Sequence, residues 1–89
     1  MTDEQINAAI AEACGWFKPN ETPVFTRYLP DYCTDLNAMA EAEKVLTYKQ
    51  FEDYLMELLD FIDEPMLSTA RQRAEAFLRT LGKWEEVQG

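Results

Sequence analysis

The fold is decided by residues 47–62, TYKQFEDYLMELLDFI. Thr47 and Gln50 have the T-x-x-Q spacing of a capping box, in which two side chains satisfy the free N–H groups at a helix start. Apolar side chains then recur at positions 51, 54, 55, 58, 59 and 62, which is the spacing of one wide helical face. We therefore predict an amphipathic helix that begins after Thr47, buries this face in the core and is ended by Pro65.

The opposite face of this predicted helix is acidic. No Lys or Arg lies between residues 50 and 70, and six carboxylates occupy 52–64: Glu52, Asp53, Glu57, Asp60, Asp63 and Glu64. Neighbouring like charges cost a few tenths of a kcal/mol per pair. One interpretation is a solvated face. The other is a negative surface that docks on a basic protein surface, or occupies a nucleic-acid channel as a mimic.

The same capping pattern predicts two further helices. Thr2 and Gln5 open a helix over 3–14, and Thr69 and Gln72 open one that starts at Ser68 or Thr69. Apolar residues follow each box at helical spacing. Gly15 and Gly82 are placed as the left-handed residues that end these two helices, although Trp84 leaves room for another turn.

The middle of the chain is less regular. Residues 18–23 have loop composition, and Val24–Leu29 is β-branched and aromatic, which predicts a short strand closed by Pro30. Another helix begins near Asp31 or Thr34 and runs to about Leu46. A lone strand has to pair with something, so Val24–Leu29 indicates a homodimer or a higher oligomer. The fold class predicted is α+β, mainly helical, with about four short helices and one strand.

Length and charge exclude several classes of function. The 89 residues predict a single domain over 1–89 with a frayed tail at 85–89, and 8 basic against 17 acidic residues give a net charge of −9. This charge argues against direct nucleic-acid binding. The chain has no His and three isolated glycines, so Ser-His-Asp or Cys-His catalysis and phosphate-cradling loops are excluded. Carboxylates at helix starts are typical of caps. We predict no enzyme, no metal and no cofactor.

The cysteines and the lack of a long apolar run indicate the compartment. No stretch resembles a signal peptide or a membrane span, so we expect no membrane association and a cytoplasmic protein. Two cysteines are too few for a disulfide scaffold. Cys14 lies on the apolar face of the first predicted helix and is expected to be buried. A Cys14–Cys33 disulfide is left open.

Basic residues cluster in the last predicted helix, where Arg71, Arg73, Arg79 and Lys83 make up half of the Lys and Arg. They either pair with the acidic face of 52–64 or form an anion pocket, for instance for a nucleotide stacked on Tyr28 or Tyr32. A separate question concerns the apolar residues that lie off the helical stripes. They form either an exposed interface or a cover for loop edges: Met56, Phe61, Tyr28 and Tyr32.

Two stretches, Pro30–Lys44 and Thr69–Trp84, resemble the phage ABA-sandwich domain family, and Ile6–Trp16 resembles its first helix. The resemblance covers roughly half to two-thirds of the chain. It implies a small α/β sandwich, found in phage genomes, without an established biochemical activity. Two departures matter. Ala40 stands where relatives often carry His, and residues 18–29 replace a longer hairpin, so the family's sheet is expected to be reduced or supplied by another chain.

Together these observations favour a phage or prophage accessory protein that acts by binding. The leading hypothesis is an acidic inhibitor or modulator of a host defence or nucleic-acid-processing protein, located in the bacterial host cytoplasm. Its partner would carry a basic surface. The alternatives are a nucleotide-sequestering anti-defence sponge and a virion assembly or scaffold component. These hypotheses rest partly on analogy with other small phage proteins.

Overall fold

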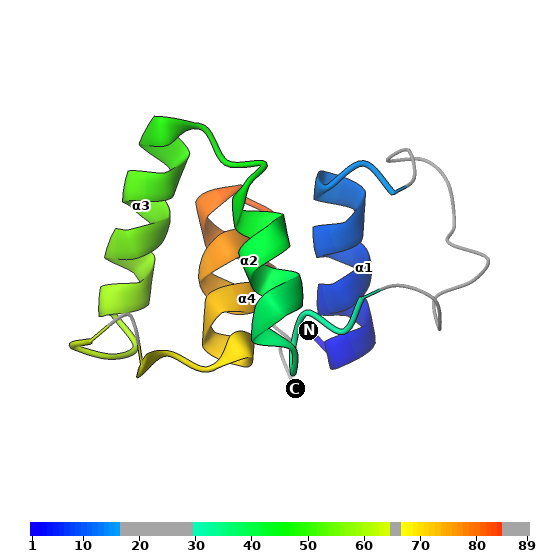
Figure 1. Cartoon of the computed structure of the whole chain (residues 1–89), viewed down its shortest axis with the longest axis horizontal. Helices are drawn as coiled ribbons and strands as arrows, with labels where there is room; N and C mark the ends of the chain where they lie inside the picture. The colour runs from blue at the N-terminus through cyan, green and yellow to red at the C-terminus, as the bar shows by residue number, and fades with distance from the viewer. Residues whose placement is uncertain (17–29, 65–66, 85–89) are drawn as a thin grey trace.

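The computed structural model describes residues 1–16, 30–64 and 67–84, and within them it contains four helices and no strand. The helices are α1 (Asp3–Ala13), α2 (Leu36–Glu43), α3 (Tyr48–Leu59) and α4 (Ala70–Thr80). In Figure 1, α2 lies in front of α4, and α1 and α3 stand on opposite sides of this pair. The mainly helical prediction is confirmed. The predicted strand Val24–Leu29 lies outside the described residues, and no sandwich is seen within them.

Local hydrogen bonds explain where the helices begin. Thr2, Thr47 and Thr69 each accept a hydrogen bond from the backbone N–H of the Gln three residues later, at 3.1–3.2 Å. Each of these Gln side chains accepts one in return from the Thr backbone N–H, at 2.9 Å. The three predicted capping boxes are therefore confirmed. In α2, Asp35 is the N-cap and its carboxylate accepts from the N–H of Asn37 at 2.9 Å.

Glycine ends α1 and α4 as the sequence predicts. Gly15 and Gly82 have φ of 87° and 71°, a left-handed conformation that other residues rarely adopt. Beyond Gly15, the N–H of Trp16 donates to the carbonyl of Ala11 at 3.0 Å, which closes a Schellman motif. The same motif ends α4, where the N–H of Lys83 donates to the carbonyl of Leu78 at 2.8 Å. Trp84 adds no further helical turn.

The second helix is shorter than predicted because the residues before it bind α1. Tyr32 and Cys33 are buried, and the Cys33 N–H donates to the Asn7 side-chain oxygen at 3.3 Å. The Asn7 amide in turn donates to Asp31 at 3.2 Å. These bonds hold 31–34 as a turn against α1, so helix α2 starts at Leu36 rather than at Asp31 or Thr34. It ends at Glu43 rather than near Leu46.

Helix α3 ends earlier than its pattern predicts, at Leu59 rather than at Pro65. The N–H groups of Phe61 and Ile62 both donate to the Leu58 carbonyl, at 3.0 and 3.1 Å, and the chain turns there. This turn brings Phe61 against the core. Proline is therefore not what stops α3.

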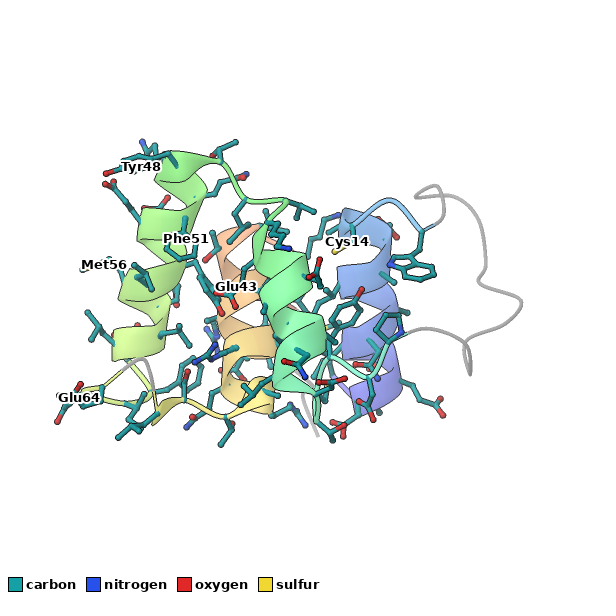
Figure 2. The ribbon with its side chains drawn as sticks, in the orientation of Figure 1. Cys14, Glu43, Tyr48, Phe51, Met56 and Glu64 are labelled. Carbon is teal, nitrogen blue, oxygen red and sulfur yellow. The ribbon has the colours of Figure 1, made fainter. Side chains whose placement is uncertain are left out.

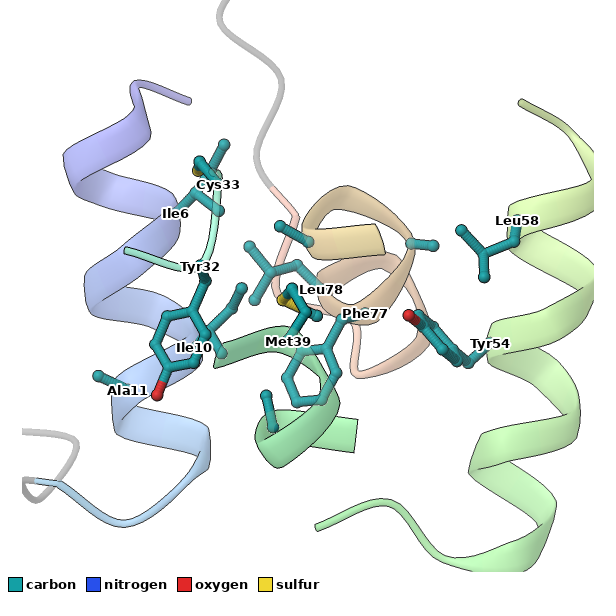
Figure 3. Close-up of a cluster of buried hydrophobic side chains, with 13 residues drawn as sticks. Ile6, Ile10, Ala11, Tyr32, Cys33, Met39, Tyr54, Leu58, Phe77 and Leu78 are labelled. Carbon is teal, nitrogen blue, oxygen red and sulfur yellow. The ribbon is translucent and has the colours of Figure 1, made fainter. Parts of the chain in front are cut away.

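Helix α4 lies at the centre of the core, and α1, α2 and α3 each pack against it. Figure 3 shows Phe77 and Leu78 of α4 among buried side chains of the other three helices, including Ile10, Met39 and Tyr54. The Tyr54 and Phe77 rings meet edge to face at 6.5 Å. Fully buried alanines on α4 provide room for close approach of the neighbouring helices.

Replacing Phe77 by Ala should remove a large part of the stability of the domain. The side chain is fully buried between helices, and truncating such an aromatic costs about 3–5 kcal/mol. Urea unfolding followed by circular dichroism measures the loss. Tyr48→Ala is the matched control, since Tyr48 is 83% exposed and should change the free energy of unfolding by less than about 0.5 kcal/mol. Equal losses in the two variants would contradict this core.

Candidate functional site

Helix α3 buries one row of side chains and leaves the others open. Side chains four residues apart form rows along a helix. The row containing Tyr54 and Leu58 is buried against α4. The next row is Phe51, Leu55 and Leu59, and its members are between 37% and 46% exposed. The prediction that the whole apolar stripe faces the core is therefore wrong, because α4 is the main packing neighbour of α3 among the described helices and covers one side of it.

A further row on α3 alternates apolar and acidic side chains. It runs Tyr48, Glu52, Met56 and Asp60, and all four are exposed. Met56 is 65% exposed and in Figure 2 lies on the outer side of α3, away from the other helices. We define the α3 ridge as the exposed apolar side chains of both rows: Tyr48, Phe51, Leu55, Met56 and Leu59.

The six predicted acidic residues lie on α3 and in the turn after it. Five of them are exposed, and Glu57 is half-buried. In the described part of the chain, none of the six forms an ion pair. Lys49 is the one cation within α3, since no Lys or Arg lies between 50 and 70. The exposed face of α3 therefore combines carboxylates that form no ion pair among the described residues with an apolar ridge.

The basic residues of the last helix bind elsewhere. Each of them lies within 4 Å of a carboxylate outside α3: Arg71 near Asp3, Arg73 near Glu43, Arg79 near Glu75 and Lys83 near Glu12. Three of these pairs join α4, or the turn after it, to α1 or α2. One interpretation of the sequence was that these cations pair with the acidic face of 52–64. Within the described ranges, none of the ion pairs that they form involves that face.

The predicted nucleotide pocket is not assembled by the described residues. Each of its four cations lies next to a different carboxylate, so the cations do not converge on one pocket. Tyr32 is buried against the core. Arg79 lines an open hollow of about 400 Å³ with Glu57, Gly82 and Trp84, and lies 5.5 Å from the Trp84 ring centre. Lys83 lines a different hollow. Tyr28 lies outside the described residues.

The structure also shows the burial of the remaining aromatic and sulfur-containing side chains that the sequence singled out. Met56 is exposed, as one interpretation expected, whereas Phe61 packs against the core. Both cysteines are free thiols, so the disulfide left open by the sequence is not formed. Cys14 packs against the core but is half-buried instead of buried as predicted, whereas Cys33 is buried. Burial raises the pKa of Cys33 to about 11, with the nearby Asp3 carboxylate acting in the same direction.

A polar cluster that the sequence analysis missed joins α2, α3 and α4. The Arg73 guanidinium lies 3.7 Å from the Glu43 carboxylate, and its Nε donates to the buried Ser68 hydroxyl at 2.9 Å. The Tyr54 hydroxyl is buried next to this pair, outside hydrogen-bonding geometry. Burial raises the pKa of Glu43, and Arg73 opposes this effect. Burial also raises the pKa of Tyr54, and the Glu43 charge adds to the rise.

A signal for this cluster was present in the sequence. Glu43 follows Met39 and Ala42 at positions i+4 and i+1, so it lies on the buried side of α2 instead of the solvent side. A carboxylate within an apolar stripe needs a partner in the core. The partner itself, Arg73, is 30 residues away and could not be assigned from spacing.

Comparisons with known proteins do not identify a relative: no family model, curated protein or solved structure matches the chain. Within the described ranges, no helix is long and apolar enough to cross a membrane. The same ranges hold no group of three or more His, Cys, Asp or Glu that could hold a metal ion. The surface of α3 and the charges around it are therefore the features from which a function can be inferred.

The Glu43 carboxylate should make stability depend on pH. Because burial raises its pKa above the unfolded value, folding favours the protonated form. Its contribution is fully present below the unfolded pKa and is lost as pH rises through the folded pKa. The free energy of unfolding of the wild type minus that of Glu43→Gln should therefore decrease between about pH 4 and pH 7.

Urea titrations of both proteins across this range measure the difference. Glu41→Gln is the matched control, because it removes an exposed carboxylate from the same helix. A wild-type advantage that stays constant or grows with rising pH would contradict the raised pKa.

The two thiols should differ in reactivity. Cys33 is buried, and its pKa of about 11 keeps it protonated at neutral pH, so it should react with a thiol reagent only after unfolding. Cys14 is half-buried, and its pKa is also raised by burial, so its native reaction should be slow. Titration with Ellman's reagent measures both. Rapid native reaction that persists in Cys14→Ser would show that Cys33 is accessible.

Proposed function

We propose that this protein acts by binding another protein through the exposed face of α3, as an acidic inhibitor or modulator of its partner. One observation carries this proposal. The carboxylates of α3 have no ion-pair partner in the described part of the chain, and the α3 ridge lies beside them on the same helix. Charge and exposed apolar area are thus combined on one surface.

Both components of this surface have a physical role in association. A contiguous apolar area on a small domain is typical of an interaction site, because its burial releases water. The carboxylates attract a basic surface, speed the encounter and make it sensitive to salt. A purely solvated acidic face would not require apolar neighbours.

The resemblance to the phage ABA-sandwich domain family supports a biological setting for this activity. It favours a phage or prophage accessory protein in the bacterial host cytoplasm, whose partner is a host defence or nucleic-acid-processing protein with a basic surface. A nucleic-acid-processing factor would carry such a surface because it binds the phosphates of its substrate. The nucleotide-sponge alternative has less support, since its four cations are each next to a carboxylate. A virion component would be found in purified particles.

Neutralising the acidic face should weaken capture of the partner. The variant Asp53→Asn/Asp60→Asn removes two exposed charges that no described ion pair uses, so folding should be unaffected. We expect wild-type protein to retain a host protein from lysate at about 50 mM salt and to release it near 500 mM. The variant should bind the isolated partner about two- to thirtyfold more weakly, since each of the two exposed charge pairs is worth about 0.2–1 kcal/mol.

The control is Glu4→Gln/Glu41→Gln, which removes the same number of exposed charges from α1 and α2. It should retain the wild-type affinity. Absence of any captured protein at low salt, or equal affinity of the two double variants, would refute the proposal.

A further inference from the structure

The α3 ridge and the carboxylates beside it together indicate the kind of partner segment that this face of α3 binds. We infer that α3 binds an amphipathic basic helix that lies along it, with apolar side chains on the ridge and Lys or Arg facing the carboxylates. This inference rests on the proposed function and names the chemistry of the partner at that same surface.

The shape of the surface favours a helix over other segments. Helix α3 spans 12 residues, and its exposed apolar side chains form rows along the helix axis. Within a row, successive side chains are four residues apart. Rows of this kind pack between the rows of a second helix. The described residues offer no strand edge that could pair with an extended peptide. The backbone within α3 is internally hydrogen-bonded, so recognition has to come from side chains.

The distribution of charge specifies the polar side of that partner. In the outer row, Met56 lies between Glu52 and Asp60, each one turn away. A helix whose apolar residues cover Leu55 and Met56 therefore places its flanking residues within reach of these two carboxylates. Opposite charges at those flanks are favourable, and acidic ones are repelled.

The same charges argue against a second copy of this chain as the occupant. Two α3 ridges packed together would bring Glu52 and Asp60 of one copy close to the same carboxylates of the other. Each copy also carries a net charge of −9. Repulsion of this kind disfavours a homodimer through α3. The ridge is therefore suited to a partner of opposite charge.

The test uses a synthetic probe of defined chemistry. It is a peptide of about 18 residues made of Leu and Lys, with leucines at i, i+3, i+4 and i+7 so that it forms one apolar face. A second peptide has the same composition in an order without an apolar face. Fluorescence anisotropy at about 150 mM salt measures the affinity of both peptides for the full chain. We expect the amphipathic peptide to bind at least about tenfold more tightly.

Variants locate the binding surface. Met56→Ser changes a side chain that is 65% exposed, so it should fold normally and weaken binding of the amphipathic peptide several-fold. Leu67→Ser is the matched control, because Leu67 is 72% exposed and lies outside α3, and it should bind as the wild type does. In a ¹⁵N-labelled sample, the amide shifts caused by the peptide should concentrate in α3.

Four outcomes would overturn the inference. Equal affinity for the two peptides would mean that charge alone is recognised; this would leave the proposed function standing, since that depends on the capture of a basic partner. Shifts spread over α1 and α2, or unchanged affinity in Met56→Ser, would place the binding elsewhere. A dimer in light scattering that Met56→Ser dissociates would show that a second copy occupies the ridge.

Discussion

Each of the other described helices packs on α4, and the exposed surface of the protein follows from this arrangement. Helix α4 contributes Phe77, Leu78 and fully buried alanines to the core, so its neighbours approach it closely. A helix that has one main neighbour buries one side. In a chain of 89 residues there is little material to cover the other sides of the outer helices. The α3 ridge remains exposed for this reason.

Most of the described ion pairs also involve α4 or the turn after it. Arg71 and Arg73 extend from α4 toward carboxylates of α1 and α2, and Lys83 lies near Glu12 of α1. These three cations thus neutralise carboxylates of α1 and α2. The net charge of −9 is consequently uneven on the described surface: the cations at the end of α2, on α4 and in the turn after α4 pair with carboxylates of α1, α2 and α4, whereas the carboxylates of α3 form no ion pair. This imbalance accounts for the acidic character of the proposed interface.

The Glu43, Tyr54 and Arg73 cluster shows a different consequence of the central helix. It brings together polar groups of three helices at a place where water is largely excluded. Such a cluster is costly to bury unless its members compensate one another, and it restricts how α2 and α3 can be arranged on α4. The rigid placement of α3 that a binding surface requires is supported by this contact and by the packing of Tyr54 on Phe77.

The helix starts at Thr2, Thr47 and Thr69 and the ends at Gly15 and Gly82 were predictable, because caps and left-handed glycines act over three to five residues. The positions of Glu52, Asp53 and Glu57 on α3 were predictable too, since they follow from helical spacing, but Asp63 and Glu64 lie beyond the end of α3 instead of on the predicted helical face. The start of α2 was not, because it depends on Asn7 of α1, 24 residues before Asp31. The early end of α3 was not, because the turn at Leu58 serves the packing of Phe61.

The sequence by itself determined that four amphipathic helices form and that the carboxylates at 52–64 have no Lys or Arg between residues 50 and 70. Only the tertiary structure decided that Tyr54 and Leu58 are buried while Phe51, Leu55 and Leu59 are partly open, and that Arg73 binds Glu43 instead of α3. The physical reason is that the pattern of apolar and charged residues along a helix determines which kind of surface each helix face can bind. Whether a neighbour is present to bind it depends on contacts between residues far apart in the chain.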